Sequence, residues 1–180
     1  MVLLRTLLIC LAVTTNGVAE ETPVVLRQLQ EIRQKGGPAV LDTAWPFLDS
    51  EHAAIRGAAR EAIQAQPFET WKARALEEKS TWASLEILRA LVESCPRDQK
   101  AQLSPHVCEQ ITTLRMEHMD ETQVLAALRL TRLVFEKLGP VSEDERLQML
   151  DLWSGLPLPV AAQEKQKLVE FLQTVRPRRP

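Results

Sequence analysis

The chain has 180 residues, of which 45% are hydrophobic and 26% charged, and its formal net charge is −2. It therefore has enough apolar residues for one domain with a buried core, which excludes a disordered chain. The near balance of basic and acidic residues excludes a general attraction to nucleic acid or anionic lipid. Aromatic residues make up only 4%, Tyr is absent, and β-branched residues never alternate over a strand length, so we expect an all-α protein.

The amino terminus has the composition of a signal peptide. Arg5 supplies a positive charge, residues 7–13 are apolar, and small residues lead up to Ala19. We expect export to the periplasm or the medium with cleavage after Ala19, and no stable membrane anchor afterwards, because the apolar run is too short to span a bilayer. Three alternatives stay open, namely a retained anchor, a lipoprotein signal at Cys10, and a buried first helix of a cytoplasmic protein.

These features divide the chain into three parts. Residues 1–19 form the signal peptide, residues 20–175 the helical domain, and residues 176–180 a disordered basic tail. The signal peptide contains one basic residue and no acidic one, so its removal changes the net charge to about −3.

Two helices are expected before residue 49. Thr22-Pro23 begins the first, and Gly36-Gly37-Pro38 stops it, because glycine and proline end helices. The second covers 38–48 with Pro46 inside it, which bends or ends the helix since proline removes a backbone hydrogen bond.

The stretch 48–66 has the clearest helical pattern in the chain. Five small or branched apolar residues fall at i, i+3, i+4, i+7 and i+8, which places them on one stripe of a helix. Asp49 and Ser50 come just before and are suited to the N-cap. The five residues of the stripe are Ile55, Ala58, Ala59, Ala62 and Ile63.

Further helices follow at regular intervals. Pro67 suits the first turn of one helix, Ser80 or Thr81 caps the next, and Cys95-Pro96 ends it. The inward positions of these two helices are Trp71, Ala75 and Leu76, then Leu85, Leu88 and Val92.

The second half of the chain contains four more expected helices. Ser104-Pro105 opens the first, Asp120 caps the second, and Gly139-Pro140 closes it. Ser142 and Glu145 form a capping-box pattern before the third. The inward positions are Val107, Ile111 and Leu114; Val124, Leu128, Thr131 and Phe135; Leu147, Leu150 and Trp153; and Leu168, Phe171, Leu172 and Val175.

Alternate helices therefore begin near Glu51, Thr81, Glu121 and Ala161. This spacing of about 30 to 40 residues is typical of arrays of paired helices, in which each pair stacks on the next. We expect about four pairs, with the first helix as a cap.

One stretch carries a family pattern: a Leu, an acidic residue at the turn, a branched apolar residue, an Arg and an Ala pair. The matching residues are Leu48, Asp49, Ile55, Arg56, Ala58 and Ala59. The stretch resembles the second helix of a HEAT repeat, and by periodicity the resemblance covers roughly 38–172. It implies a right-handed α-solenoid of antiparallel helix pairs.

Three segments are also similar to helical-repeat segments of large exported planctomycete and verrucomicrobial proteins. They are 49–74, 125–130 and 168–172. In those proteins such segments lie beside sugar-dehydrogenase-like propellers and c-type cytochrome domains. This chain has no Cys-x-x-Cys-His motif and no propeller repeat, so we expect no cofactor and do not transfer the redox role.

Arginines are the candidate partner-binding residues. Arg56 and Arg60, four residues apart, are expected on one exposed edge of the inner helix, where a ladder of such residues can bind an acidic protein or peptide partner along a concave face. The alternative is solvated arginines that pair with Asp49, Glu61 or Glu86, each pair contributing less than about 1 kcal/mol. Related places in later units are held by Arg74, Arg89, and Arg129 or Arg132.

Cysteines and histidines offer two weaker candidates. Cys95 and Cys108 are a candidate disulfide in an oxidising compartment. The same two cysteines with His106 and His118 are the only set that resembles metal ligands, but His106 and Cys108 are two residues apart and point to different sides of a helix. We therefore expect no metal site.

Four tryptophans and two polar pairs complete the candidates. On helical stripes, we expect tryptophans to be core residues more often than interface anchors. Ser104 with His106, and His52 with Asp49, are neighbours in sequence only, so we expect no enzyme. The tryptophans are Trp45, Trp71, Trp82 and Trp153.

The sequence favours an exported, non-enzymatic scaffold or protein-interaction module without nucleic-acid binding. The alternative is a structural accessory or detached fragment of a larger periplasmic redox or sugar-dehydrogenase-like assembly. An adjacent propeller or cytochrome gene would favour this alternative.

Overall fold

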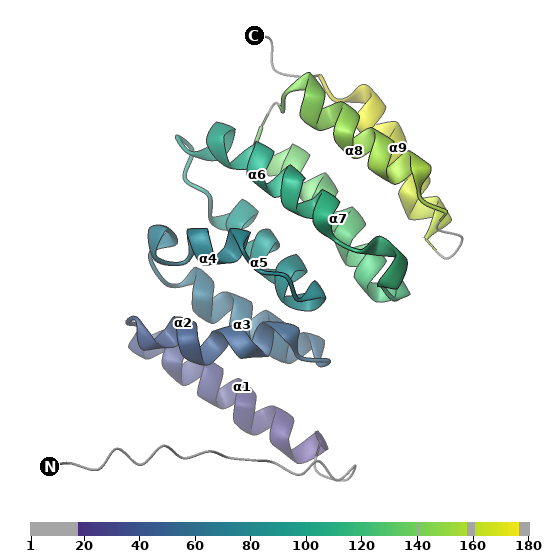
Figure 1. Ribbon diagram of the computed structural model, residues 1–180. Helices are drawn as coiled ribbons and strands as arrows, with labels where there is room; N and C mark the ends of the chain where they lie inside the picture. The colour runs from purple at the N-terminus through teal and green to yellow at the C-terminus, as the bar shows by residue number, and fades with distance from the viewer. Residues whose placement is uncertain (1–17, 140, 158–160, 177–180) are drawn as a thin grey trace, which may run out of the picture.

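The computed structural model describes residues 18–139, 141–157 and 161–176, with side chains from Thr22 onward. Within these ranges the protein is all helical and contains no strand, which confirms the expected class. Nine α-helices and three short 3-10 helices of the described residues pack together (Figure 1). The predicted signal peptide lies almost wholly outside these ranges, and of the predicted tail only Arg176 lies inside them.

The helices follow one another with short connections. Their bounds are α1 (Val18–Lys35), α2 (Ala39–Ala44), η1 (Trp45–Asp49), α3 (Ala53–Gln64), η2 (Phe68–Thr70), α4 (Lys72–Leu76), α5 (Thr81–Ser94), α6 (Lys100–Thr113), η3 (Met116–His118), α7 (Glu121–Lys137), α8 (Glu143–Gly155) and α9 (Ala162–Thr174). Over the described residues, no helix combines the length and apolar character needed to cross a bilayer.

The helices lie in successive layers, with α1 at one end and α8 and α9 at the other (Figure 1). Helix α3 packs against α1 and α5, α5 also packs against α7, and α7 also packs against α9. On the other side of these helices, α4 contacts α6, and α6 contacts α8. The layers thus follow one another in chain order, with alternate helices of the chain in contact.

One hydrophobic core runs through all the layers. The apolar stripes of α3, α5 and α7 are largely buried, as their helical spacing predicts. Fully buried residues come from each part of the stack: Leu29, Leu48, Ile63, Trp71, Leu88, Ile111, Val134, Met149 and Leu172.

Both helices with strong capping signals begin where the sequence predicts. Asp120 Oδ1 accepts a hydrogen bond from the Gln123 amide at 2.8 Å, and Gln123 Oε1 accepts one from the Asp120 amide at 3.0 Å. Ser142 and Glu145 form the same reciprocal pair at the start of α8. These bonds satisfy amide groups that have no partner within the helix.

Two predicted helix starts are wrong, because proline does not open these helices. Helix α1 begins at Val18, four residues before Thr22, and α6 begins at Lys100, four residues before Ser104. In α6 the Leu103 amide already donates to the Gln99 carbonyl at 2.9 Å. Pro105 therefore removes one hydrogen bond from an established helix, and burial of Leu103 favours the earlier start.

The predicted N-cap at Asp49 or Ser50 is also wrong. Pro46 converts the end of α2 into the 3-10 helix η1, which continues to Asp49. Helix α3 starts only after His52, whose side chain makes no capping bond. The Ser50 hydroxyl instead accepts from the His52 amide at 3.2 Å.

The predicted inner stripe of α8 is shifted. Leu147 is 47% exposed, whereas Met149 and Trp153 are fully buried. Glu145 lies on the same stripe and is buried because its carboxylate closes the capping box. The polar residue at this position conceals the i, i+4, i+8 pattern in the sequence.

Candidate binding groove

A groove of about 390 Å³ lies between α5 and α7, and two residues at the start of α3 also line it. The residues from α5 are spaced by three or four apart from one adjacent pair, as are those from α7, so each set occupies one face of its helix. Helix α5 supplies Trp82, Leu85, Glu86, Arg89 and Glu93; helix α7 supplies Thr122, Ala126, Arg129, Leu130 and Leu133; and α3 supplies Ala53 and Arg56.

Arg56 lines the groove from α3, and it is buried rather than on the exposed edge predicted for it. Its Nη1 donates to the Ser50 carbonyl at 2.8 Å and to the Glu51 carbonyl at 3.0 Å. The guanidinium carbon lies 3.5 Å from the centroid of the Trp82 ring. Arg56 therefore holds the turn before α3 against α5.

Glu86 joins Arg56 to Arg60 across the α3–α5 contact. Its Oε1 accepts from Arg56 Nε at 3.4 Å, and its Oε2 accepts from Arg60 Nη1. All three side chains are largely buried. The structure contains the pairing of arginine with Glu86 that the alternative named, but these side chains are buried rather than solvated as the alternative supposed. Arg56 and Arg60 are thus both used within the fold.

Arg89 and Glu93 form an ion pair along α5, at 2.9 Å between Nε and Oε1. Burial raises the pKa of Glu93, but bonds from Arg89 and Gln64 and the charge of Arg60 outweigh it and leave that pKa below its usual value. Glu93 is therefore ionised at neutral pH. The groove contains negative as well as positive charge.

Arg129 is a third arginine of the groove. From the sequence it was expected only as an alternative to Arg132 in the candidate ladder. It is exposed on α7 and lines both this groove and a smaller hollow between α7 and α9. Among the described residues it makes no ion pair, although its charge helps to lower the pKa of Glu164, which Lys167 binds. In the sequence, its spacing of three residues from Ala126 indicates that both residues lie on the same face of α7.

Arg74 lies apart from the groove, so the candidate ladder is not one continuous row. It belongs to α4, where its Nη1 donates to Asp42 at 2.9 Å and its guanidinium stacks on Trp45. It joins α4 to α2 on the other side of the stack.

Three of the four tryptophans belong to the core. Trp45, Trp71 and Trp153 are buried, which supports the core interpretation. Trp45 Nε1 donates to Glu78 at 2.7 Å, and Trp153 Nε1 donates to the Thr131 hydroxyl at 3.2 Å. Trp82 is half-buried and lines the groove, so it alone is placed to contact a ligand there.

Cys95 and Cys108 are free and buried in the structure, so the candidate disulfide is not formed in it. Cys95 follows α5 directly, and Cys108 lies within α6. Burial and the charge of Glu145 raise the pKa of Cys108 to about 12, although the Ser104 hydroxyl lowers it.

The structure does not bring the other candidate groups together. His106 and His118 are exposed, unlike the two cysteines, and the described residues contain no group of three potential ligands placed to hold a metal ion. Ser104 is buried while His106 is exposed on the same helix. His52 and Asp49 are exposed and share no hydrogen bond.

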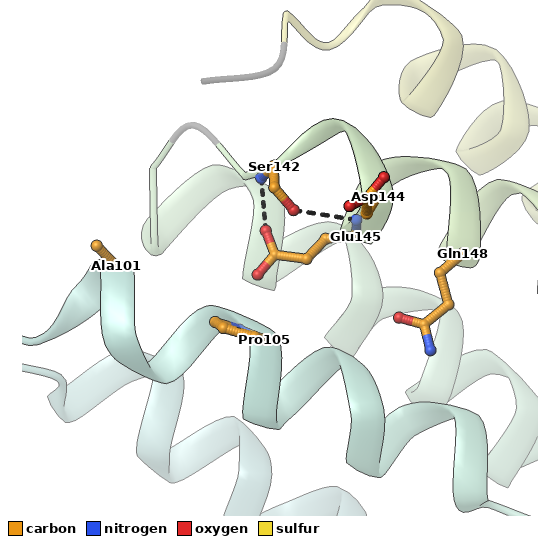
Figure 2. Close-up of a pocket in the computed structure, with 6 residues that line it drawn as sticks. All are labelled: Ala101, Pro105, Ser142, Asp144, Glu145 and Gln148. Carbon is orange, nitrogen blue, oxygen red and sulfur yellow. Dashed lines mark hydrogen bonds between the residues drawn. The ribbon is translucent and has the colours of Figure 1, made fainter. Parts of the chain in front are cut away.

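A second hollow, of about 510 Å³, lies between α6 and α8. Figure 2 shows Ala101 and Pro105 on one side and the capping box of α8 on the other. The Glu145 side chain extends toward α6 but turns its carboxylate back to the Ser142 amide, which donates to it at 2.6 Å. The Ser142 and Glu145 side chains of this hollow therefore act in the capping of α8.

The described residues thus form an all-helical protein whose α5 and α7 enclose an amphipathic groove. Comparison with protein-family models, with curated proteins and with solved structures found no match for this chain.

Proposed function

We propose that the protein is an exported, non-enzymatic interaction module built as a HEAT-like, right-handed α-solenoid. In this proposal the groove between α5 and α7 binds a protein or peptide partner. The export signal is the apolar amino-terminal run that precedes Ala19.

The order of helix contacts supports the solenoid. Each layer packs mainly on the layers before and after it, from α1 through α3, α5 and α7 to α9. In a repeat array of this kind the inner helices form one long surface suited to binding.

The groove is the observation that carries the proposal. Its floor is apolar, with Leu85 and Leu130 buried, while Arg89 and Arg129 are exposed at its rim. Binding sites combine an apolar surface with a few placed polar groups in this way. The half-buried Trp82 adds the type of residue that is enriched at the centres of protein interfaces.

A groove-blocking variant tests the proposal in the native host. Thr122 is exposed and lines the groove, so Thr122→Trp fills part of it without touching the core. The tagged wild-type protein is recovered from the exported fraction with its partners, in parallel with the variant. We expect a partner that is retained by the wild type and lost by Thr122→Trp.

Thr113→Trp is the matched control, since Thr113 is exposed at the end of α6 and does not line the groove. Circular dichroism checks that both variants keep the helical fold. A partner that binds Thr122→Trp as well as the wild type would refute the groove, and failure to find the protein outside the cytoplasm would refute export.

A further inference from the structure

The groove has a charge and a shape that narrow the choice of partner. We propose that it binds an extended peptide segment that carries both acidic and apolar side chains, with Arg129 contacting a carboxylate. This inference rests on the proposed interaction function and adds the chemical class of the ligand.

Positive charge is in excess around the groove, although the whole chain carries a net charge of −2. Three arginines line it, Arg56, Arg89 and Arg129, against the two carboxylates Glu86 and Glu93. Arg60 does not line the groove, but it pairs with Glu86 and so adds a fourth cation next to it. An acidic ligand thus meets complementary charge on a molecule that otherwise repels it.

The arginines in and beside the groove differ in whether they already form ion pairs within the protein. Arg56 and Arg60 share Glu86, and Arg89 pairs with Glu93. Arg129 is exposed and has no ion pair among the described residues. A planar guanidinium can donate two hydrogen bonds to one carboxylate, so Arg129 can bind an acidic side chain without breaking an existing pair.

The apolar floor of the groove favours a peptide over a purely anionic ligand. Leu85, Leu130 and Leu133 lie between the charged rims and are matched by apolar side chains rather than by phosphate groups. The volume of about 390 Å³ lies within the range of small-ligand pockets, about 300–1,000 Å³, and holds a few side chains rather than a domain surface. The two glutamates further disfavour a polyanion such as nucleic acid.

The inference is tested with three pools of short fluorescein-labelled peptides that share the same apolar positions. The remaining positions are Asp and Glu in the first pool, Lys and Arg in the second, and Ser and Asn in the third. Fluorescence anisotropy with the purified mature protein measures binding. We expect the acidic pool to bind about tenfold more tightly than the basic pool, and more weakly as salt is raised.

Two charge-reversal variants assign the binding to Arg129. Arg129→Glu is expected to weaken binding of the acidic pool about tenfold, because repulsion replaces attraction. Arg97→Glu is the matched control, since Arg97 is exposed, lies outside the groove and likewise makes no ion pair among the described residues. This variant makes the same change in net charge and is expected to bind as the wild type does.

The outcomes separate the two proposals. Equal binding of all three pools, or equal losses in both variants, overturns the acidic preference but leaves a binding groove that Thr122→Trp would still block. Absence of binding by every pool overturns the inference, and the interaction function then depends on the partners recovered from the host.

Discussion

Arg56 joins three segments of the chain through one guanidinium group. It donates to carbonyls of the turn before α3, pairs with Glu86 on α5 and stacks on Trp82. At 4% exposure it is among the most buried charged residues described. Such a charge contributes to stability through partners that would otherwise be left unsatisfied in a dry environment.

Replacement of Arg56 by Ala is expected to lower the free energy of unfolding by about 3 kcal/mol, because two carbonyls and part of Glu86 lose their donor. Urea denaturation followed by circular dichroism measures the change. Arg89→Ala is the control, since the pair of Arg89 with Glu93 is half exposed and contributes less than about 1 kcal/mol. Equal losses in the two variants would contradict a structural role for Arg56.

Glu78 is expected to make stability dependent on pH. Its carboxylate accepts from the Trp45 indole and from the amides of Ser80 and Lys79. Burial raises its pKa, but these bonds outweigh burial and lower the pKa below the usual 4.5. A pKa that is lower in the folded state stabilises the protein fully above about pH 4.5, and this contribution is lost as the pH falls through the folded value.

Urea denaturation between about pH 7 and pH 3 tests this expectation on the wild type and Glu78→Gln. The variant should be less stable at neutral pH and should lose less stability on acidification. Glu77→Gln serves as the control, since Glu77 is exposed and its side chain makes no hydrogen bond among the described residues. The same pH dependence in wild type and Glu78→Gln would exclude the effect.

The residue types in the sequence show which side chains are able to form ion pairs, but they do not show which of these side chains are buried. Pairing of an arginine with Glu86 could be predicted, because Glu86 is an acidic residue on α5, which packs against α3. Burial of Arg56 could not, since it depends on how the turn at Ser50 directs its carbonyl toward α3. That Arg129 makes no ion pair with any other described residue likewise depends on the distance between α7 and its neighbours.

At the scale of single helices, two serine residues at N-cap positions are expected to contribute differently to the stability of the protein. Ser142 accepts from the Glu145 amide within a capping box, whereas Ser80, at the N-cap of α5, makes no capping bond. Ser142→Ala is therefore expected to destabilise the protein by about 1 kcal/mol, and Ser80→Ala by much less. Thermal denaturation of the two variants measures the difference, and equal midpoints would contradict it.

Two glycines in helical surroundings should respond to alanine in opposite ways. Gly57 lies inside α3 with ordinary helical geometry and open space at its Cβ position, so Gly57→Ala should stabilise the protein by about 1 kcal/mol. Gly139 follows α7 with a φ of +90°, where alanine is strained, so Gly139→Ala should destabilise it by a similar amount, about 1 kcal/mol. Chemical denaturation checks the signs, and changes of the same sign would refute this account.

Helix starts could be predicted where the signal is local. The capping boxes at Asp120 and Ser142 depend on residues three apart, and both are confirmed. The cap expected at Asp49 fails because Pro46 makes the preceding chain a 3-10 helix that already uses this residue. At Pro105 the buried Leu103 and an existing turn extend α6 past a residue that usually marks a boundary.

Across the whole molecule, the layered order of contacts predicts uneven stability. Helix α5 is packed between α3 and α7, whereas α9 packs mainly on α7 and α8. In a stack the end layers have fewer neighbours and open at lower free energy. Native-state hydrogen exchange should show stronger protection for 85–92 than for 165–172, and uniform protection would indicate one globular unit that unfolds all at once.

The all-α class and the spacing of the helices were predictable because period and composition are properties of the sequence alone. The predicted starts at Thr81 and Glu121 are confirmed, and Ala53 and Ala162 lie within two residues of expectation. The relation to the HEAT family and the handedness stay predictions, since both depend on small rotations between layers that no periodicity encodes.

The intrinsic fluorescence of the half-buried Trp82 should report on the groove. Its three companions are shielded in the core, so a small quencher such as acrylamide reaches this indole first. Any occupant that covers the ring should protect it from quenching and shift the emission to shorter wavelength. Tryptophan fluorescence should therefore detect a ligand in the groove without an attached label.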